Sequence, residues 1–194
     1  MIETRVLTGA ALDMALDDLA QLRISVFRDW PYLYDGDLAY ERNYLQTYRD
    51  SADAILVGAF DGDRLVGAST GTPMVDHAED FASALSGVGI ALSDIFYCAE
   101  SVLLPEYRGH GVGHAFFDAR EAHARGLGCT NSAFCGVVRP VGHPLRPTDH
   151  RPLDGFWHKR GYAPVEGAVA QYRWKDIDQP GETDHDLQFW MRAL

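Results

Sequence analysis

The sequence predicts a single-domain α/β protein over residues 1–194, and three observations lead to that prediction. Strand-like runs alternate with segments whose apolar residues recur every three or four positions, in the order β-α-α-β-β-β-α-β-α-β-β. An Asp61-Gly62 pair joins two of the strand-like runs as a hairpin. No repeat, low-complexity tract or long linker divides the chain, whose length is typical of one domain.

Each expected element follows from its local pattern. The segment 10–27 carries leucines three or four residues apart, and Pro31 and Gly36 follow it with an aromatic-rich loop. Gly126 and Gly128 mark the end of a later helix. The expected strands are 3–7, 54–60, 64–70, 94–104, 130–138, 169–174 and 186–192. The expected helices are 10–27, 38–48, 112–125 and 153–160, with a short helix over 76–85 inside the acidic connection 74–92.

Charge is distributed unevenly along the chain. Residues 1–100 hold 17 acidic side chains against six arginines, a net charge of −11, whereas residues 101–194 are balanced. The acidic first half would repel nucleic acid, so we expect no nucleic-acid partner. No apolar run approaches the ~18 residues that span a membrane, and the N-terminus lacks the regions of a secretory signal. We therefore expect no membrane association and a cytoplasmic location.

Cysteine and histidine give no sign of a metal centre. The three cysteines, Cys98, Cys129 and Cys135, are an odd number within or beside expected core strands. We interpret them as reduced core thiols of a cytoplasmic protein. His143 and His150 stand seven residues apart with no carboxylate at a familiar ligand spacing, so no metal site is expected.

The most informative segment is a glycine-rich turn that joins the expected strand 94–104 to the expected helix 112–125. Such a turn leaves backbone N–H groups unpaired at the N-terminus of a helix, where the helix dipole adds partial positive charge. Glycine lets the backbone approach an anion closely, and Arg108 adds a full charge. The turn therefore suits a phosphate group, although a glycine-rich turn that binds nothing would have the same composition.

Two motifs resemble the GNAT superfamily of acetyl-CoA-dependent N-acetyltransferases. The turn has the spacing R-x-x-G-x-G over 108–113, preceded by a strand and Pro-Glu-Tyr, and resembles that family's pyrophosphate loop. The segment 156–162, Phe-Trp-His-Lys-Arg-Gly-Tyr, resembles its late F-Y-x-x-x-G-F helix end. The resemblance implies one mixed, mostly antiparallel sheet of about seven strands with helices on both faces. The residues that it assigns to acetyl-CoA are Val102, Leu103, Leu104, Arg108, Gly109, His110, Gly111, Val112, Gly113 and His114.

The resemblance also implies direct attack of a primary amine on the thioester of acetyl-CoA, with a base to accept the amine proton. Glu100 is the expected base, because it lies in an otherwise apolar strand just before the residues that would hold the thioester. An outward-facing acid paired with an arginine is the alternative interpretation. Trp157 stands where the family often has its acidic tyrosine, so Tyr162 or His158 is expected to replace it.

The acceptor is expected between the first two helices. Tyr32 and Tyr34 are substrate candidates because aromatic rings bind a cationic amine, and Asp35 is a candidate for pairing with its charge. Arg139, in the basic loop 139–151, is a candidate for binding an anionic group on the substrate. The expected function is acetylation of a small-molecule amine. Acetylation of a protein or peptide amine and a silent acyl-CoA sensor are the alternatives.

Members of this superfamily are often dimers, so a homodimer is a further expectation. The last expected strand, within residues 186–194, would pair with its copy across the interface.

Overall fold

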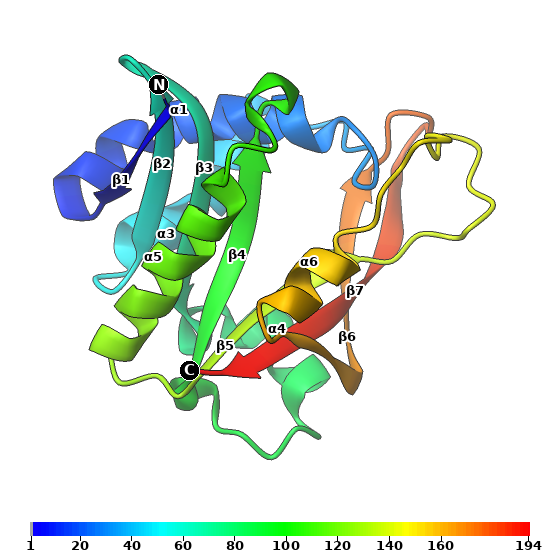
Figure 1. Ribbon diagram of the computed structural model, residues 1–194. Helices are drawn as coiled ribbons and strands as arrows, with labels where there is room; N and C mark the ends of the chain where they lie inside the picture. Colours follow the sequence, from blue (N-terminus) through cyan, green and yellow to red (C-terminus); the bar gives the residue numbers. More distant parts are fainter. Residues whose placement is uncertain (1) are drawn as a thin grey trace.

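The computed structural model describes residues 2–194, in which one sheet of seven strands lies between two layers of helices (Figure 1). The strand order is β1-β2-β3-β4-β5-β7-β6, and every neighbouring pair is antiparallel except β4 and β5. The strands are β1 (Ile2–Leu7), β2 (Ile55–Asp61), β3 (Arg64–Pro73), β4 (Ile95–Leu103), β5 (Asn131–Val137), β6 (Ala163–Lys175) and β7 (Glu182–Ala193). The α-helices are α1 (Gly9–Phe27), α2 (Leu38–Tyr44), α3 (Gln46–Asp50), α4 (Ala78–Leu85), α5 (Val112–Gly126) and α6 (Asp154–Lys159). Short 3-10 helices are η1 (Met74–His77), η2 (Leu92–Asp94) and η3 (Pro105–Tyr107). The predicted mixed, mostly antiparallel sheet with helices on both faces is confirmed.

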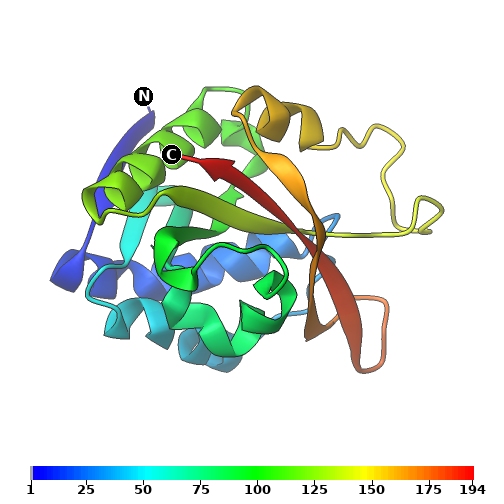
Figure 2. The same ribbon diagram turned by 90° about the horizontal axis from the view of Figure 1, so that it is seen from below.

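The helices divide between the two faces of the sheet. Figure 2 shows α5 and α6 on one face and α1, α3 and α4 on the other. The leucines of α1, including Leu12, Leu16 and Leu19, pack into the core on its own face. Val112, Phe116 and other apolar residues of α5 pack into a second core on the opposite face. The sheet therefore separates two hydrophobic cores.

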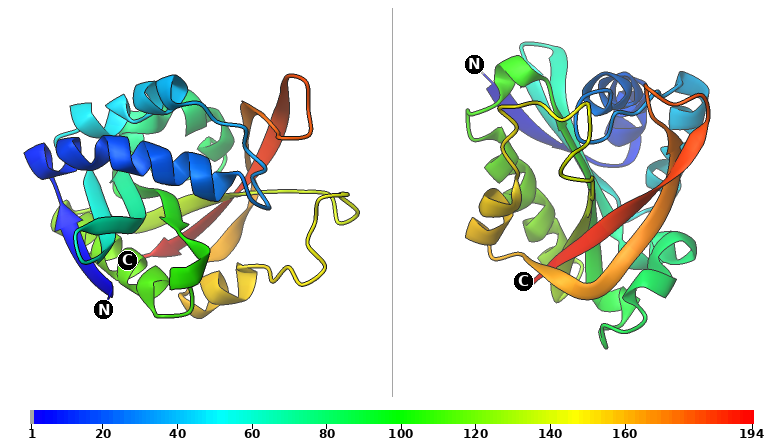
Figure 3. Two further views of the ribbon diagram at one scale, coloured as in Figure 1. Left: turned by 90° about the horizontal axis from the view of Figure 1, so that it is seen from above. Right: turned by 90° about the vertical axis from the view of Figure 1, so that its right-hand side faces the viewer.

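The parallel pair β4 and β5 separates soon after it begins. Pairing runs from Ile95 with Asn131 to Tyr97 with Ala133, although both strands continue beyond these residues. Figure 3 shows the β6–β7 hairpin turned away from the first four strands. In the part of the chain that the structure describes, the edge of β4 that faces β5 consequently has no strand partner from Cys98 onward.

A β-bulge interrupts β4 at the point where the two strands separate. Cys98 pairs with Gly71 and Ser101 pairs with Ser69, which leaves Ala99 and Glu100 opposite one residue of β3. A bulge of this kind bends the strand and turns a side chain that would otherwise alternate to the other face.

Three expectations differ from the structure. The expected helix 38–48 is two helices, separated at the buried Leu45. Strand β6 begins at Ala163, before the expected 169, because the strand continues beyond a register shift that contains Gly167 at φ 74°. The expected pairing of 186–194 across a dimer interface is wrong, because β7 already has β5 on one side and β6 on the other.

The three cysteines are buried free thiols, as the sequence indicated. Within residues 2–194, no helix combines the length and apolar character that crossing a bilayer requires.

Candidate active site

The glycine turn presents backbone N–H groups at the N-terminus of α5. Gly109 and Gly111 both adopt φ 82°, in the left-handed region that side chains disfavour. A Cβ at either glycine would meet nothing within 4 Å, so the space above the turn is open. Across residues 2–194, the amides of 109–113 have no hydrogen-bond acceptor. This geometry fits a phosphate group, with the dipole of the 15-residue helix behind it.

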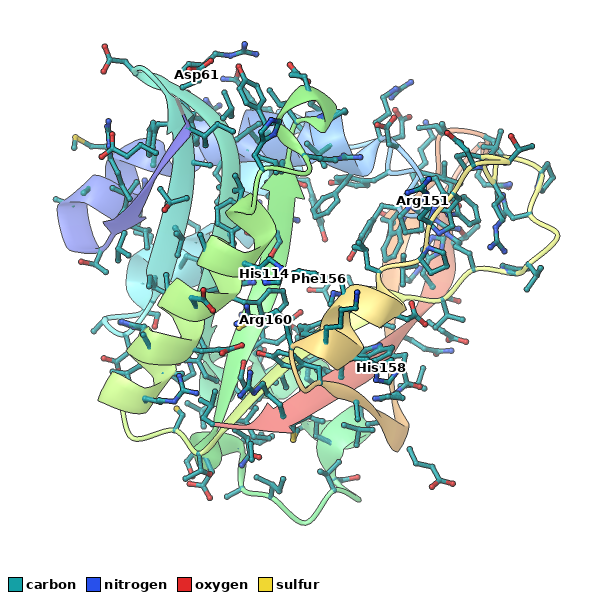
Figure 4. The ribbon with its side chains drawn as sticks, in the orientation of Figure 1. Asp61, His114, Arg151, Phe156, His158 and Arg160 are labelled. Atoms are coloured by element: carbon teal, nitrogen blue, oxygen red, sulfur yellow. The ribbon has the colours of Figure 1, made fainter. Side chains whose placement is uncertain are left out.

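The second motif packs directly on this turn. A Cβ at Gly113 would lie 3.5 Å from the ring of Phe156, which itself contacts His114 with ring centroids 4.9 Å apart. Arg160 donates to Asp118 at 2.7 Å and to Glu121 at 3.2 Å, and it lies 3.2 Å from Nδ1 of His114. Figure 4 shows His114, Phe156 and Arg160 together between α5 and α6. The structure thus brings together the two segments that carry the sequence resemblance.

The strand residues assigned to acetyl-CoA lead into this turn. Val102 is fully buried, and the amide of Leu104 donates to the carbonyl oxygen of Val66 at 3.0 Å. Arg108 is exposed, and its Nε donates to the carbonyl oxygen of Leu103 at 3.2 Å, which holds the guanidinium beside the turn. Nδ1 of His110 lies 3.2 Å from the carbonyl oxygen of Tyr107. These residues form one continuous edge from the unpaired part of β4 to the start of α5.

A buried arginine from α5 holds the bulge of β4. Arg120 is 1% exposed and donates to the carbonyl oxygens of Thr70 at 3.1 Å and Glu100 at 3.0 Å. It also donates to Oγ of Ser101 at 2.9 Å. The carbonyl groups at the bulge therefore accept hydrogen bonds from the charged Arg120, which fixes the backbone of Glu100.

Glu100 is a buried carboxylate with one oxygen available. The residue is 5% exposed, and its Oε2 lies 2.7 Å from Arg23, which also pairs with the buried Glu41. Within the described residues, Oε1 of Glu100 has no hydrogen-bond partner. A buried carboxylate oxygen without a donor is costly, so this oxygen is suited to accepting an N–H from a ligand.

Glu100 opens into a pocket whose walls are mainly aromatic. The pocket holds about 660 Å³ of space, including the part open to solvent, and nine of its fifteen lining residues are aromatic. Helices α1, α2 and α4 and the loop after α1 contribute Phe27, Tyr32, Tyr34, Tyr40, Tyr44 and Phe81, and the strands contribute Tyr97, Tyr172 and Trp174.

The tyrosine hydroxyl groups and the cysteine thiol of these walls are neutral. Burial raises the pKa of Tyr32, Tyr34 and Tyr97, so their hydroxyl groups remain protonated at ordinary pH. Burial also raises the pKa of the lining thiol Cys135 to about 11, and the hydroxyl of Tyr97 lies 3.2 Å from its sulfur. A neutral thiol is a poor nucleophile, so Cys135 acts as part of the wall.

Tyr32 and Tyr34 line the pocket, but the other two candidates for substrate binding, Asp35 and Arg139, do not. Asp35 pairs with Arg28 at 3.0 Å and with Lys175 at 2.8 Å, outside the pocket lining. Arg139 has a role different from the one expected for it. Its guanidinium pairs with the buried Asp176 at 2.6 Å and donates to the carbonyl oxygens of the loop after α1, Pro31 at 2.7 Å among them. Since its donors are occupied, Arg139 holds the wall together and is not free for a substrate anion.

Tyr162 also takes a structural position. It is 1% exposed, and its hydroxyl donates to Glu121 at 3.0 Å and lies 2.8 Å from Oγ of Ser132. Burial raises its pKa, and its ring packs in the core on the α5 side. Neither Tyr162 nor His158 lines the pocket, and Trp157 packs on Phe134 with ring centroids 4.9 Å apart. Tyr162 therefore lies in the core and not where the expected acid would meet the substrate.

Sequence reasoning missed Arg23, the residue that links Glu41 to Glu100. A signal was present, because Arg23 follows Leu16 and Leu19 on the apolar face of α1, where an arginine is unusual unless it is paired. Its partner Glu41 is fully buried on the short helix α2. In the part of the chain that the structure describes, no group of three or more His, Cys, Asp or Glu side chains could hold a metal ion.

Comparisons with known proteins concern the family and the fold of the chain. The family model described as the acetyltransferase (GNAT) family matches residues 17–144. No curated protein matches the chain. The fold is similar to the ribosomal-protein-alanine N-acetyltransferase of Brucella melitensis, with 12% identity, a TM-score of 0.62 and 99% of each chain covered.

Two further solved structures carry the cofactor or its product. One is yncA from Salmonella typhimurium with its cofactor acetyl-CoA, at 10% identity and TM-score 0.59, covering 100% of this chain and 94% of the other. The second is the paia N-acetyltransferase of Thermoplasma acidophilum in complex with coenzyme A, at 13% identity and TM-score 0.55, covering 100% and 99%. At such identities the likeness concerns the fold.

Proposed function

The chain belongs to the acetyltransferase (GNAT) family of acyltransferases, and on that premise we propose that it moves the acetyl group of acetyl-CoA to the primary amine of a small molecule. One observation supports the proposal above the others. Glu100 lines a pocket at the point where β4 separates from β5, and Oε1 of its buried carboxylate has no partner within residues 2–194.

The residues of the glycine turn fit the cofactor. Acetyl-CoA supplies an acetyl group already activated as a thioester. The unpaired amides of 109–113 would bind its pyrophosphate, and the guanidinium of Arg108 would add a full positive charge. The unpaired edge of β4 near Val102 and Leu103 would supply backbone hydrogen bonds to the pantetheine arm. No metal is part of this proposal.

Glu100 would act as the general base. The amine must lose a proton to become a nucleophile, and Glu100 is the carboxylate that lines the pocket, with its buried Oε1 free of any partner among the described residues. Arg23 holds the other oxygen at 2.7 Å and so fixes the orientation of the carboxylate. The aromatic walls would exclude water from the amine. We assign no acid to the departing thiol, since a thiol has a pKa of about 8.5 and needs little help to leave.

The lining of the pocket supports a small-molecule acceptor. Small-molecule sites are lined mostly by apolar and aromatic side chains, with a few polar groups that fix the orientation of the ligand. Nine of the fifteen residues that line the pocket at Glu100 are aromatic, which places its lining in that class.

The test is a screen of amines for release of CoA thiol from acetyl-CoA, followed by the same assay on Glu100→Gln. Losing a general base should lower kcat by about 10²–10⁴-fold, while isothermal titration should show unchanged acetyl-CoA affinity. Glu79→Gln, an exposed acid on α4, is the control and should retain full activity.

Two outcomes would contradict the proposal. Equal turnover in Glu100→Gln would place the base elsewhere. Tight acetyl-CoA binding without turnover of any amine in the screen would favour an acyl-CoA sensor.

A further inference from the structure

We infer that the acceptor is an arylalkylamine, a primary amine joined by a short chain to an aromatic ring and free of anionic groups. The inference rests on the proposed acetyl transfer and names its substrate class. It depends on three features of the pocket: the nature of its walls, the position of its carboxylate, and the pairing of every cation that lines it.

The walls present aromatic faces to whatever enters. Neighbouring rings lie within stacking distance, with centroids 4.3 Å apart for Phe27 and Tyr32 and 5.0 Å apart for Phe81 and Tyr97. The hydroxyl of Tyr97 contacts Cys135 and that of Tyr44 contacts Tyr48, so these polar ends already have partners. A wall of this kind favours a planar apolar body, because offset and edge-to-face ring contacts add to the burial of apolar area.

The carboxylate gives the pocket one fixed polar end. Glu100 lines the pocket and is 5% exposed; Arg23 lies 2.7 Å from its Oε2, while its Oε1 has no partner among the described residues. An amine is the complementary group, since it offers N–H donors to that oxygen and, when protonated, a charge that the surrounding rings also attract. The ligand is therefore oriented with its nitrogen at Glu100 and its body among the rings.

Every cation that lines the pocket is already paired. The guanidinium of Arg23 lies between Glu41 and Glu100, and its planar face covers the ring of Tyr44 at 4.3 Å. Arg173 is a rim residue, 64% exposed in its side chain, and lies 3.4 Å from Asp184. Arg139, outside the lining, is bound to Asp176.

A substrate carboxylate or phosphate would consequently enter without a counter-ion and close to Glu100. Burying an unpaired charge is expensive, and a like charge nearby adds to the cost. We therefore expect the pocket to reject amino acids that have the same ring and the same amine as an accepted substrate.

The experiment compares four amines in the thiol-release assay at one pH. The probes are 2-phenylethylamine, phenylalanine, butylamine and spermidine. Phenylalanine adds only a carboxylate to 2-phenylethylamine, butylamine lacks the ring, and spermidine has more charge and no ring. We expect kcat/KM for 2-phenylethylamine to exceed that for phenylalanine by about 100-fold, as for an unpaired buried charge, and that for butylamine by about 10-fold.

The outcomes separate the substrate class from the proposed function. Turnover of phenylalanine, butylamine or spermidine at or above the rate for 2-phenylethylamine would overturn the arylalkylamine assignment and leave acetyl transfer standing. Absence of thiol release with all four probes and with the wider amine screen would overturn acetyl transfer and this inference together.

A second measurement does not depend on turnover. Isothermal titration of 2-phenylethylamine into the CoA-bound protein should show binding, and phenylalanine should bind about 100-fold more weakly. Tyr40 lies at the open side of the pocket, 42% exposed, so Tyr40→Ala should fold normally. Tyr40→Ala should weaken 2-phenylethylamine more than butylamine, whereas Met14→Ala, 79% exposed on α1, should change neither. Equal weakening of both amines would argue against a ring-binding wall.

Discussion

The cofactor turn and the acceptor pocket are built in opposite ways. The turn is one continuous segment, 108–114, that offers backbone amides and open space. The pocket collects side chains as far apart in the sequence as Arg23 and Trp174, each held by contacts with other elements. A site made of consecutive backbone groups depends on local conformation, whereas a site made of distant side chains depends on the whole fold. Substitutions should therefore affect the two sites differently.

The largest effect is expected at the turn itself. Gly111→Asp places a side chain and a negative charge at φ 82°, where the phosphate of acetyl-CoA would lie. Isothermal titration should show no measurable acetyl-CoA binding. The matched control is Gly126→Asp at the other end of α5, where a Cβ meets nothing within 4 Å and φ is not positive. Unchanged affinity in Gly111→Asp would remove the cofactor site from this turn.

The next effect should appear at the Arg139–Asp176 ion pair, which we call the clamp because it holds the loop after α1. Arg139→Met removes the arginine partner of the buried Asp176, and breaking a buried ion pair typically costs about 3–5 kcal/mol. Urea denaturation should show this loss, and the KM for the acceptor should rise while acetyl-CoA affinity stays constant. Changing both partners, Arg139→Met with Asp176→Leu, should restore part of the stability. Arg151→Met, an exposed arginine of the same loop, is the control, and an equal loss there would contradict the clamp.

A smaller effect is expected from the one charged side chain of the turn. Arg108→Ala should weaken acetyl-CoA binding by about 1–3 kcal/mol, the range for a charge-assisted hydrogen bond, since the backbone amides remain in place. Titration at low and high salt should show the difference shrinking as salt screens the charge. Arg125→Ala, exposed near the end of α5, should bind normally. A loss as complete as that of Gly111→Asp would mean that the side chain, and not the backbone, dominates.

The smallest effect concerns pH and the pocket wall. His185 stacks on Trp174 with ring centroids 3.8 Å apart, and burial lowers its pKa although Asp176 acts in the opposite direction. The unfolded chain therefore binds the histidine proton near pH 6.5 while the folded chain does so only at lower pH. Stability should fall as the pH drops below about 6.5, by at most about 1.4 kcal/mol per pH unit. Urea midpoints at pH 7.5 and 5.5 should differ less in His185→Asn, and an unchanged difference would contradict this role.

Much of the fold was predictable because local pattern determines the elements that flank the site. The strand expected at 94–104 is Ile95–Leu103, and the helix expected at 112–125 is Val112–Gly126. The first part of β6 was missed, because Pro164 and Gly167 favour turns and long-range pairing with β7 overrides them. The strand order and the early separation of β4 from β5 depend on tertiary contacts that one sequence does not reveal.

The candidate site was also predictable only where local sequence determines the structure. The turn could be predicted because glycine spacing determines backbone conformation, and the aromatic residues Tyr32 and Tyr34 were also expected in the pocket. The charged candidates were less predictable, because a charge takes whichever partner the fold brings near. Arg139 forms an ion pair with Asp176, and Asp35 forms one with Lys175. The role of Glu100 as a base stays a prediction.

The short pairing between β4 and β5 also has a consequence for how the molecule folds. Within residues 2–194, three residue pairs, Ile95 with Asn131 through Tyr97 with Ala133, make up the strand pairing between β1–β4 and β5–β7. In the first set β2 and β3 are joined directly by a short turn, and in the second set β6 and β7 are joined by one short loop, whereas the parallel pair needs the crossover through α5. We expect two cooperative units in native-state hydrogen exchange, with the junction opening first.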